Sequence, residues 1–287
     1  MTREGPSSSV TRAVTAASAL AGRAGVDVRT LSGTDDLAVA AQLFAELWGS
    51  PFSDQILRAL DLSGNYVAGA FDGSGALVAA SAAFAAVAAE PELHSHVTAV
   101  ALSHRRRGLG LVMKFHQRAW ALERGIGVIT WTFDPLIKRN ANFNLARLGA
   151  RAHDYRENVY GDMDDALNGR DESDRLWVSW RLAEPEVEAA AAGMPRYVAT
   201  PAGAAERLKP RPDGTPVTLA TDEAAGQAFV CQVPDDIESL RRSDPEVASS
   251  WRLALRDTLG QALASGWRIL GVNTDGNYVV VPPVARQ

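Results

Sequence analysis

The chain has 287 residues, of which 46% are hydrophobic, and a formal net charge of −5. This length is enough to bury one large core or two smaller ones. The negative charge argues against a nucleic-acid-binding protein, because contact with backbone phosphates needs a basic face over most of a domain. A single cysteine, Cys231, excludes an internal disulfide, and we expect a reducing, cytoplasmic location.

Residues 1–24 are rich in Ser, Thr and Ala, and we expect a mobile tail there. Arg12 interrupts the mildly apolar stretch from Val10 to Leu20. This stretch therefore fits neither a signal peptide nor a membrane span, which needs about 20 continuous apolar residues. No membrane partner is expected.

From residue 26 onward, strand and helix patterns alternate, as in an α/β protein. The first part predicts a strand at 26–31, helices at 34–48 and 53–62, and a hairpin of strands 65–71 and 76–87 around the turn Asp72–Gly75. The patterns that follow predict a strand at 93–102, a helix at 109–124, a strand at 127–133, a helix at 138–148, a strand at 150–159, a helix at 163–167 and a strand at 175–182.

The last third of the chain changes in composition. Residues 184–214 lack a stable periodicity, which indicates a linker between a domain at 25–183 and an α/β extension at 215–287. In the extension we expect strands at 216–220 and 228–233, helices at 235–241 and 245–264, and a hairpin of strands 267–272 and 277–281. Three roles stay open for it: covering the acceptor side of a cleft, extending the sheet, or forming a homodimer.

The most informative stretch runs from His94 to Gly110. Alternation along its strand predicts one shared face for His94, His96, Thr98, Val100 and Leu102. The following turn has the spacing R-x-x-G-x-G, with Arg105, Gly108 and Gly110, and opens a helix. Backbone amides in such a turn can bind an anion where the helix dipole favours it. By itself, the pattern also fits an ordinary strand-to-helix turn.

Other nucleotide-binding motifs do not fit this turn. No Gly-Lys-Ser/Thr follows the glycines, so it is not a P-loop, and the parallel βαβ start of a Rossmann fingerprint is missing. His94 and His96 could be a metal pair, a base or a hydrogen-bonded structural pair. Zinc needs at least a third ligand, and since none is obviously placed, no metal is expected.

The chain resembles the GNAT (Gcn5-related N-acetyltransferase) superfamily in the pattern V-x-x-x-x-R-x-x-G-x-G, carried here by Val100, Arg105, Gly108 and Gly110. The resemblance covers about residues 26–182. Shorter segments are similar to a bacterial branch of predicted acetyltransferases with a C-terminal extension: Trp131–Leu136, Phe143–Leu145, Tyr160–Gly161 and Asp174–Leu176. The fold implied is a mixed, mostly antiparallel twisted sheet flanked by helices, followed by a smaller α/β extension.

The resemblance implies acetyl-CoA as co-substrate and a small primary amine as acceptor, joined by direct attack in a ternary complex. The pyrophosphate would bind the amides of residues 106–111, and the pantetheine arm would lie along the strand near Val100 and Leu102. The implied cofactor-binding residues are Val100, Ala101, Leu102, Arg105, Arg106, Arg107, Gly108, Leu109, Gly110 and Leu111, together with Asn142 and Asn144.

The resemblance also implies catalytic residues. His94 and His96 precede Val100 by the offsets of the histidine pair in serotonin N-acetyltransferase, and an imidazole can remove the proton of the amine. Many members protonate the leaving thiolate with a tyrosine where this chain has Leu145, so Tyr155 and Tyr160 are the substitutes. Alternatives that stay open are a longer acyl donor, a hydroxyl or protein-amine acceptor, and a non-catalytic acyl-CoA sensor.

Overall fold

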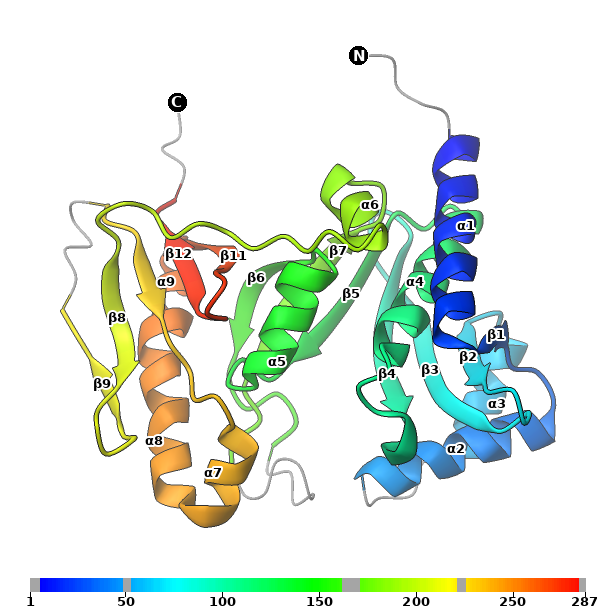
Figure 1. Cartoon of the computed structure of the whole chain (residues 1–287), viewed down its shortest axis with the longest axis horizontal. Helices are drawn as coiled ribbons and strands as arrows, with labels where there is room; N and C mark the ends of the chain where they lie inside the picture. The colour runs from blue at the N-terminus through cyan, green and yellow to red at the C-terminus, as the bar shows by residue number, and fades with distance from the viewer. Residues whose placement is uncertain (1–5, 49–52, 162–170, 221–225, 284–287) are drawn as a thin grey trace. The chain divides into compact units, whose positions relative to one another are not determined.

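The computed structural model describes residues 6–48, 53–161, 171–220 and 226–283 (Figure 1). The chain forms two compact units, one of residues 1–131 and 181–192, the other of residues 132–180 and 193–287. This division differs from the expected domains, because residues 132–180 associate with the C-terminal part. For example, Tyr278 donates a hydrogen bond of 2.8 Å to the carbonyl oxygen of Pro135.

The first unit is a sheet with helices on both faces. Its elements are α1 (Pro6–Ala24), β1 (Asp27–Thr30), α2 (Thr34–Trp48), α3 (Asp54–Leu62), β2 (Tyr66–Phe71), β3 (Leu77–Ala86), β4 (Glu92–Val100), η1 (Leu102–His104), α4 (Leu109–Glu123), the first part of β5 (Val128–Phe133) and α6 (Pro185–Ala191). Strands β1 to β4 pair antiparallel in sequence order, and β4 pairs parallel with β5. Leu37, Phe44 and Leu57 of α2 and α3 pack on Val67 and Val97 of the sheet.

Helix α1 occupies most of the segment where a mobile tail was expected, so that prediction is wrong for residues 6–24. Ala13 and Ala17 are buried against Ala119 of α4, and Arg12 pairs with Glu188 at 2.9 Å. Alanine has the highest helix propensity, and its small side chain lets two helices approach closely. A stripe of alanines therefore packs well although its hydrophobicity is low.

The second unit holds two groups of strands and the C-terminal helices. Its elements are α5 (Lys138–Ala141), which continues as a π-helical turn η2 (Asn142–Arg147), β6 (Arg151–Arg156), β7 (Arg175–Arg181), β8 (Ala205–Pro210), β9 (Pro216–Thr218), β10 (Phe229–Cys231), α7 (Ile237–Ser243), α8 (Pro245–Leu255), η3 (Arg256–Gly260), α9 (Gln261–Ala264), β11 (Arg268–Val272) and β12 (Tyr278–Val281). A five-stranded sheet has the order β11-β12-β10-β8-β9.

The predicted fold class is confirmed. Seven strands hydrogen-bond in the order β1-β2-β3-β4-β5-β7-β6, and most neighbours are antiparallel. The linker prediction for 184–214 is wrong in part, because Pro185 begins helix α6 and residues 205–210 form β8, which pairs parallel with β10. The helix predicted at 163–167 lies outside the described residues.

Candidate active site

The turn between β4 and α4 has the backbone geometry of an anion-binding loop. Gly108 adopts a left-handed conformation with φ +79° at the N-cap of α4, and Arg106, at φ +66°, does the same without being glycine. Left-handed backbone is uncommon and costly for a side chain with a Cβ, and such strain concentrates at functional sites. The sequence R-x-x-G-x-G therefore forms a tight, locally strained turn that opens directly into a helix.

Five consecutive amides of this turn are available. The amides of His104 and Arg105 donate to Ala101 and Leu102, and those of Leu111 and Val112 donate to Gly108. Between them, the N–H groups of residues 106–110 have no backbone acceptor in the part of the chain that the structure describes. Because these amides lie at a helix N-terminus, they suit an oxyanion with several oxygens. Leu111, expected to take part, already uses its amide inside the helix.

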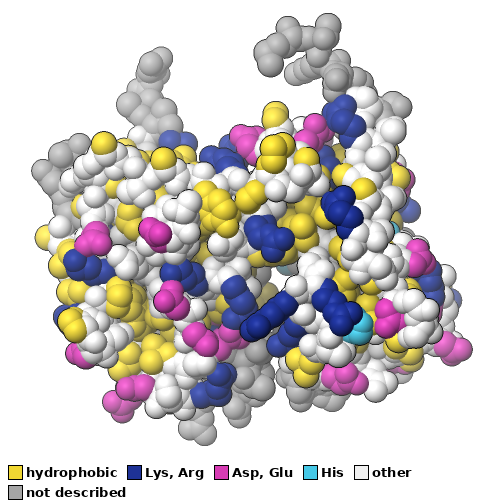
Figure 2. Space-filling view, in the orientation of Figure 1, with side chains coloured by type: hydrophobic (Ala, Val, Ile, Leu, Met, Phe, Trp, Pro, Cys, Tyr) yellow, Lys and Arg dark blue, Asp and Glu magenta, His cyan; other side chains and the backbone are white. Residues whose placement is uncertain are grey.

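Arginine side chains surround the loop with positive charge. Arg105, Arg106 and Arg107 are exposed, and none of them appears in an ion pair among the described residues. Elsewhere on the face seen in Figure 2, basic side chains lie among acidic and apolar ones. The arginine run is thus a local source of charge, suited to a phosphate-bearing ligand.

Strand β4 carries a β-bulge that changes the expected faces. Ala82 pairs with Val97 whereas Ala83 pairs with Ser95, so His96 is the extra residue. An inserted residue reverses the alternation. His94, opposite Phe84, therefore faces the same side as Val97 and Ala99, and Thr98 and Val100 face the other side. The prediction of one shared face for His94, Thr98 and Val100 is wrong, and Leu102 lies beyond the strand in η1.

Both histidines lie near the ring of Phe84 on β3. The ring of Phe84 lies 5.2 Å from the ring of His94 and 5.9 Å from that of His96, measured between centroids. Nδ1 of His94 lies 3.2 Å from Oγ1 of Thr130 on β5. His96 retains exposed surface, yet desolvation by neighbouring groups lowers its pKa below the ordinary value for histidine. A lowered pKa keeps the imidazole neutral at neutral pH, the form that accepts a proton.

The pairing of β4 with β5 is short. It joins Glu92, Leu93 and His94 to Val128, Ile129 and Thr130 and ends there, whereas β4 continues to Val100 on its β3 side. Beyond His94, backbone groups on the edge of β4 opposite β3 can therefore pair with an extended ligand. Ala101 is an exception among the predicted contacts, since its amide donates to Val78 of β3 at 2.9 Å.

Sequence reasoning missed Lys114, which lies on the buried side of α4. Its Nζ donates to Oγ of Ser95, the residue between the two histidines, at 2.8 Å, and lies 3.8 Å from the ring centroid of Trp131. Burial lowers its pKa to about 7. The available signal was a lysine between the apolar residues Met113 and Phe115, in a chain with three lysines. Trp131 is buried, as a core residue would be.

The predicted tyrosines belong to the second unit and differ from each other. Tyr155 donates from its hydroxyl to Asp174 at 2.7 Å, and burial together with that carboxylate raises its pKa well above the ordinary value. Tyr160 is about half exposed, with its hydroxyl 3.3 Å from Oγ1 of Thr132. Tyr155 thus has a structural hydrogen bond, whereas the hydroxyl of Tyr160 is accessible.

The two predicted asparagines also have structural surroundings. Oδ1 of Asn142 accepts a hydrogen bond of 3.1 Å from Tyr197, and the side chain of Asn144 is buried at 5% exposure. Both lie on the π-helical turn η2. Neither has the accessibility of the arginines at the β4–α4 turn.

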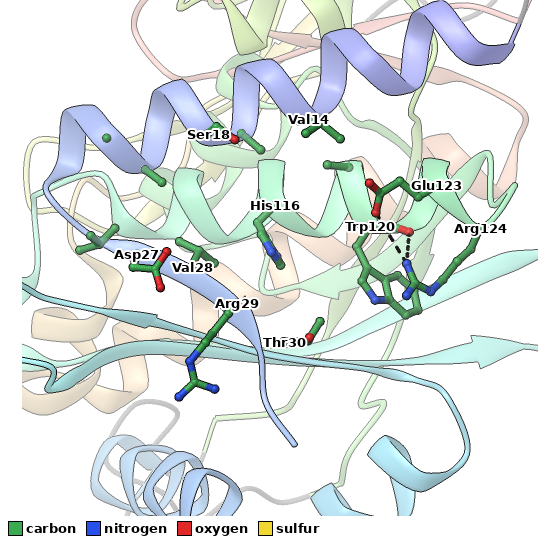
Figure 3. A pocket seen from close by; sticks show the side chains of 15 residues that line it. Val14, Ser18, Asp27, Val28, Arg29, Thr30, His116, Trp120, Glu123 and Arg124 are labelled. Carbon is green, nitrogen blue, oxygen red and sulfur yellow. Dashed lines mark hydrogen bonds and ion pairs between the residues drawn. The ribbon is translucent and has the colours of Figure 1, made fainter. Parts of the chain in front are cut away.

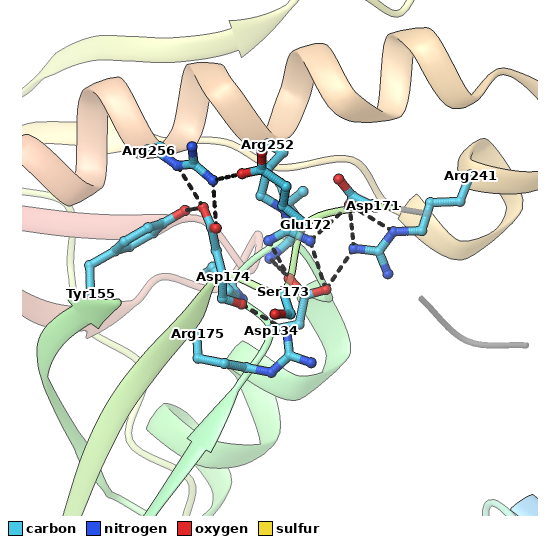
Figure 4. Close-up of polar contacts among 12 residues, drawn as sticks. Asp134, Tyr155, Asp171, Glu172, Ser173, Asp174, Arg175, Arg241, Arg252 and Arg256 are labelled. Carbon is cyan, nitrogen blue, oxygen red and sulfur yellow. Dashed lines mark hydrogen bonds and ion pairs between the residues drawn. The ribbon is translucent and has the colours of Figure 1, made fainter. Parts of the chain in front are cut away.

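A buried network of charges holds the second unit together (Figure 4). Asp134 accepts hydrogen bonds from Arg241 at 2.6 Å and from Arg252 at 2.8 and 3.0 Å, and Asp171 accepts from the same two arginines. The two guanidinium groups lower the pKa of Asp134 well below its usual range, against the opposing effect of burial. This network joins the residues after β5 to helices α7 and α8.

Two further properties concern the described residues. No group of three or more His, Cys, Asp or Glu is placed there to hold a metal ion. None of the helices found in those ranges combines the length and the apolar character needed to cross a bilayer.

No protein-family model matches the chain, and no curated protein matches it in sequence. Similar solved structures include the ribosomal-protein-S18-alanine N-acetyltransferase from Escherichia coli, with 16% identity and a TM-score of 0.45 over 55% of this chain and 95% of that one. Ard1 from Thermoplasma volcanium has 14% identity and a TM-score of 0.44 over 54% and 96%. An N-acetyltransferase from Staphylococcus aureus has 10% identity and a TM-score of 0.45 over 55% and 98%.

Proposed function

We propose that the chain is an N-acyltransferase of the GNAT type, which transfers acetyl from acetyl-CoA to a small primary amine in the cytoplasm. The observation that carries this proposal is the run of five available amides at residues 106–110, at the N-terminus of α4 and beside three exposed arginines. Such a loop suits the pyrophosphate of coenzyme A. Acetyl-CoA supplies the activated acyl group when bound.

The free edge of β4 supports the second part of the binding site. Since β4 runs on for six residues after its pairing with β5 ends at His94, an extended arm with amide groups can add to it as a strand would. The positions proposed for this contact are Val100, at the end of β4, and Leu102, in η1 just after it. A backbone N–H of β4 directed at the thioester carbonyl would stabilise negative charge on its oxygen.

His94 and His96 are the proposed bases. The amine must lose a proton before or as its nitrogen forms the bond to the acyl carbon, and a neutral imidazole can accept that proton directly or through water. As the new C–N bond forms, the C–S bond breaks and the thiolate takes up a proton. For that second proton we propose Tyr160, because the hydroxyl of Tyr155 already donates to Asp174.

Binding of acetyl-CoA, measured by isothermal titration calorimetry, tests the loop. Gly108→Ala strains the left-handed turn and adds a Cβ beside the available amides, so we expect affinity to fall about ten-fold or more. Gly75→Ala is the matched control, since Gly75 has a similar φ of +83° and equally open surroundings in the β2–β3 turn. Equal affinities of the two variants would contradict the proposed site.

A further inference from the structure

A cavity lies within the first unit, between α1, β1 and α4 (Figure 3). Its volume is about 630 Å³, within the range of roughly 300 to 1,000 Å³ typical of small-molecule sites. No residue of β4 or of the turn at 101–111 lines it. The cavity is therefore built from other residues than the proposed acyl-CoA site, and it exists because α1 packs on α4.

The positive charges that line the cavity already have partners. Arg29 donates two hydrogen bonds to Asp36, of 2.6 and 3.0 Å, and its guanidinium lies 4.3 Å from the ring centroid of Phe71. In Figure 3 its side chain extends away from α4. Arg124 stacks on the ring of Trp120 at 4.1 Å and donates to the backbone carbonyl of the same residue.

The negative charges are less satisfied. The carboxylate of Asp27 has no hydrogen bond or ion pair with the described residues, and Glu123 has one loose ion pair of 3.8 Å with Arg124. Asp27 acts through space on Arg29 and on His116. Since both arginines have partners, the carboxylate of Asp27 is the charged group of this cavity that a ligand can pair with.

His116 adds a polar group without positive charge. Its side chain points from α4 into the cavity (Figure 3), and Nδ1 lies 2.9 Å from the hydroxyl of the fully buried Tyr66. Burial lowers the pKa of His116 to about 4, with a smaller opposing effect from Asp27. The imidazole is therefore neutral at neutral pH and does not balance the carboxylate.

The part of the wall between α1 and Trp120 is mainly apolar, and Ser18 and Thr30 add two hydroxyl groups to the lining. Helix α1 contributes Val14, Ala17 and Ala21, and α4 contributes the ring of Trp120 opposite β1. A hydrated inorganic ammonium ion would not bury this apolar surface. A cation with a hydrocarbon or aromatic body would cover it, and would place its charge near Asp27.

We propose that this cavity binds a small organic ammonium compound, with the ammonium group against Asp27 and the apolar body between α1 and Trp120. The site is separate from the one that carries the proposed acyl transfer, and the proposal does not depend on that activity. The groups proposed to recognise the ligand are the carboxylate of Asp27, the neutral imidazole of His116 and the apolar surface of α1 and Trp120, all within the first unit.

Calorimetric titration with 2-phenylethylammonium and with 3-phenylpropionate, an anion of similar shape, tests the proposal. We expect saturable binding of the ammonium compound, at least ten-fold weaker binding of the anion, and a loss of ten-fold or more in ammonium affinity for Asp27→Asn. Glu246→Gln makes the same change in net charge at an exposed position of the second unit and should leave the affinity unchanged.

A second pair of variants tests the location without removing a charge. Gly22 lines the cavity on α1 and has helical backbone with open space around an added Cβ, so Gly22→Leu fills the cavity and Gly22→Ala barely enters it. We expect Gly22→Leu to reduce affinity ten-fold or more relative to Gly22→Ala. His94→Gln/His96→Gln should bind the probe like the wild type, which distinguishes this cavity from the proposed acceptor site. No saturable binding, equal binding of the anion, or no effect of Asp27→Asn and Gly22→Leu would each overturn the proposal.

Discussion

Replacing Lys114 by Met should make the stability difference between variant and wild type depend strongly on pH. Lys114 is buried at 7% exposure, and its Nζ contacts the hydroxyl of Ser95, the ring of Trp131 and, at 3.5 Å, the amide oxygen of Gln117. None of these partners carries a negative charge. Burial therefore lowers the pKa of Lys114 to about 7. Methionine keeps a similar apolar stem and removes the ionisable amine.

The size of the effect follows from the two pKa values of Lys114. In the unfolded chain its pKa is about 10.4, so above pH 7 the folded protein releases a proton that the unfolded chain keeps. Since the unfolded state then binds more protons, the free energy of unfolding of the wild type rises by roughly 1.4 kcal/mol per pH unit up to about pH 10. Below pH 7 both states hold the proton, and the full cost of burying the charge remains. Between pH 6 and pH 9 the wild type should gain about 3 kcal/mol relative to Lys114→Met.

Urea denaturation of both proteins at pH 6, 7, 8 and 9 measures this difference. Lys209→Met, which removes a lysine that is not buried, is the control for the loss of one positive charge. If the difference between Lys114→Met and wild type stays constant over this pH range, Lys114 remains protonated when folded, and the reasoning from burial is refuted.

Three further outcomes are expected. In urea denaturation, Asp134→Asn should lower the free energy of unfolding by about 3 to 5 kcal/mol, because it leaves Arg241 and Arg252 with one buried carboxylate fewer. The control Asp235→Asn breaks an exposed ion pair with Lys138 and should lower it by about 1 kcal/mol or less. Because the pKa of Asp134 is lowered on folding, its contribution should be present above about pH 4 and fade below it; no loss on acidification would contradict this assignment. Tyr155→Phe should reduce stability and Tyr160→Phe should reduce the rate of thiol release, and the reverse pattern would exchange their roles. The acid limb of kcat/KM should lie below about pH 6.5, the ordinary pKa of histidine, because desolvation lowers the pKa of His96; a limb well above that value would point to another base.

Much of the fold follows from sequence periodicity. The strands and helices at 26–156 were predicted with small errors at their ends, because apolar spacing, helix caps and turn residues indicate the same boundaries there. Ser53 caps α3, and Gly125 has a φ of +72° directly after α4. The sequence did not predict helix α1, because alanine is only weakly hydrophobic and its helix face is therefore not distinct. In the structure, Ala13 and Ala17 of this helix pack closely on α4.

The tight turn at the start of α4 was predictable from the sequence, and the geometry of strand β4 before it was less so. The sequence places glycines at 108 and 110 in the turn, and Gly108 is the one that adopts left-handed backbone, which costs glycine little. Spacing does not reveal the bulge at His96, because one unpaired residue leaves the alternation of residue types unchanged while it reverses the faces beyond it. The arginine partners of Asp134 are more than a hundred residues away in sequence, and the carboxylate partner of Tyr155 is about twenty residues away. The spacing of neighbouring residue types cannot predict such distant pairs.

Acceptor-dependent release of coenzyme A thiol from acetyl-CoA, measured over a panel of primary amines, tests the central claim most directly. The wild type should release thiol with at least one amine, and His94→Gln/His96→Gln should lose at least two orders of magnitude in rate while it binds acetyl-CoA as before. Binding of acetyl-CoA without turnover on any amine would contradict an amine acetyltransferase and favour an acyl-CoA sensor. Full turnover in the double variant would contradict the role assigned to the histidines.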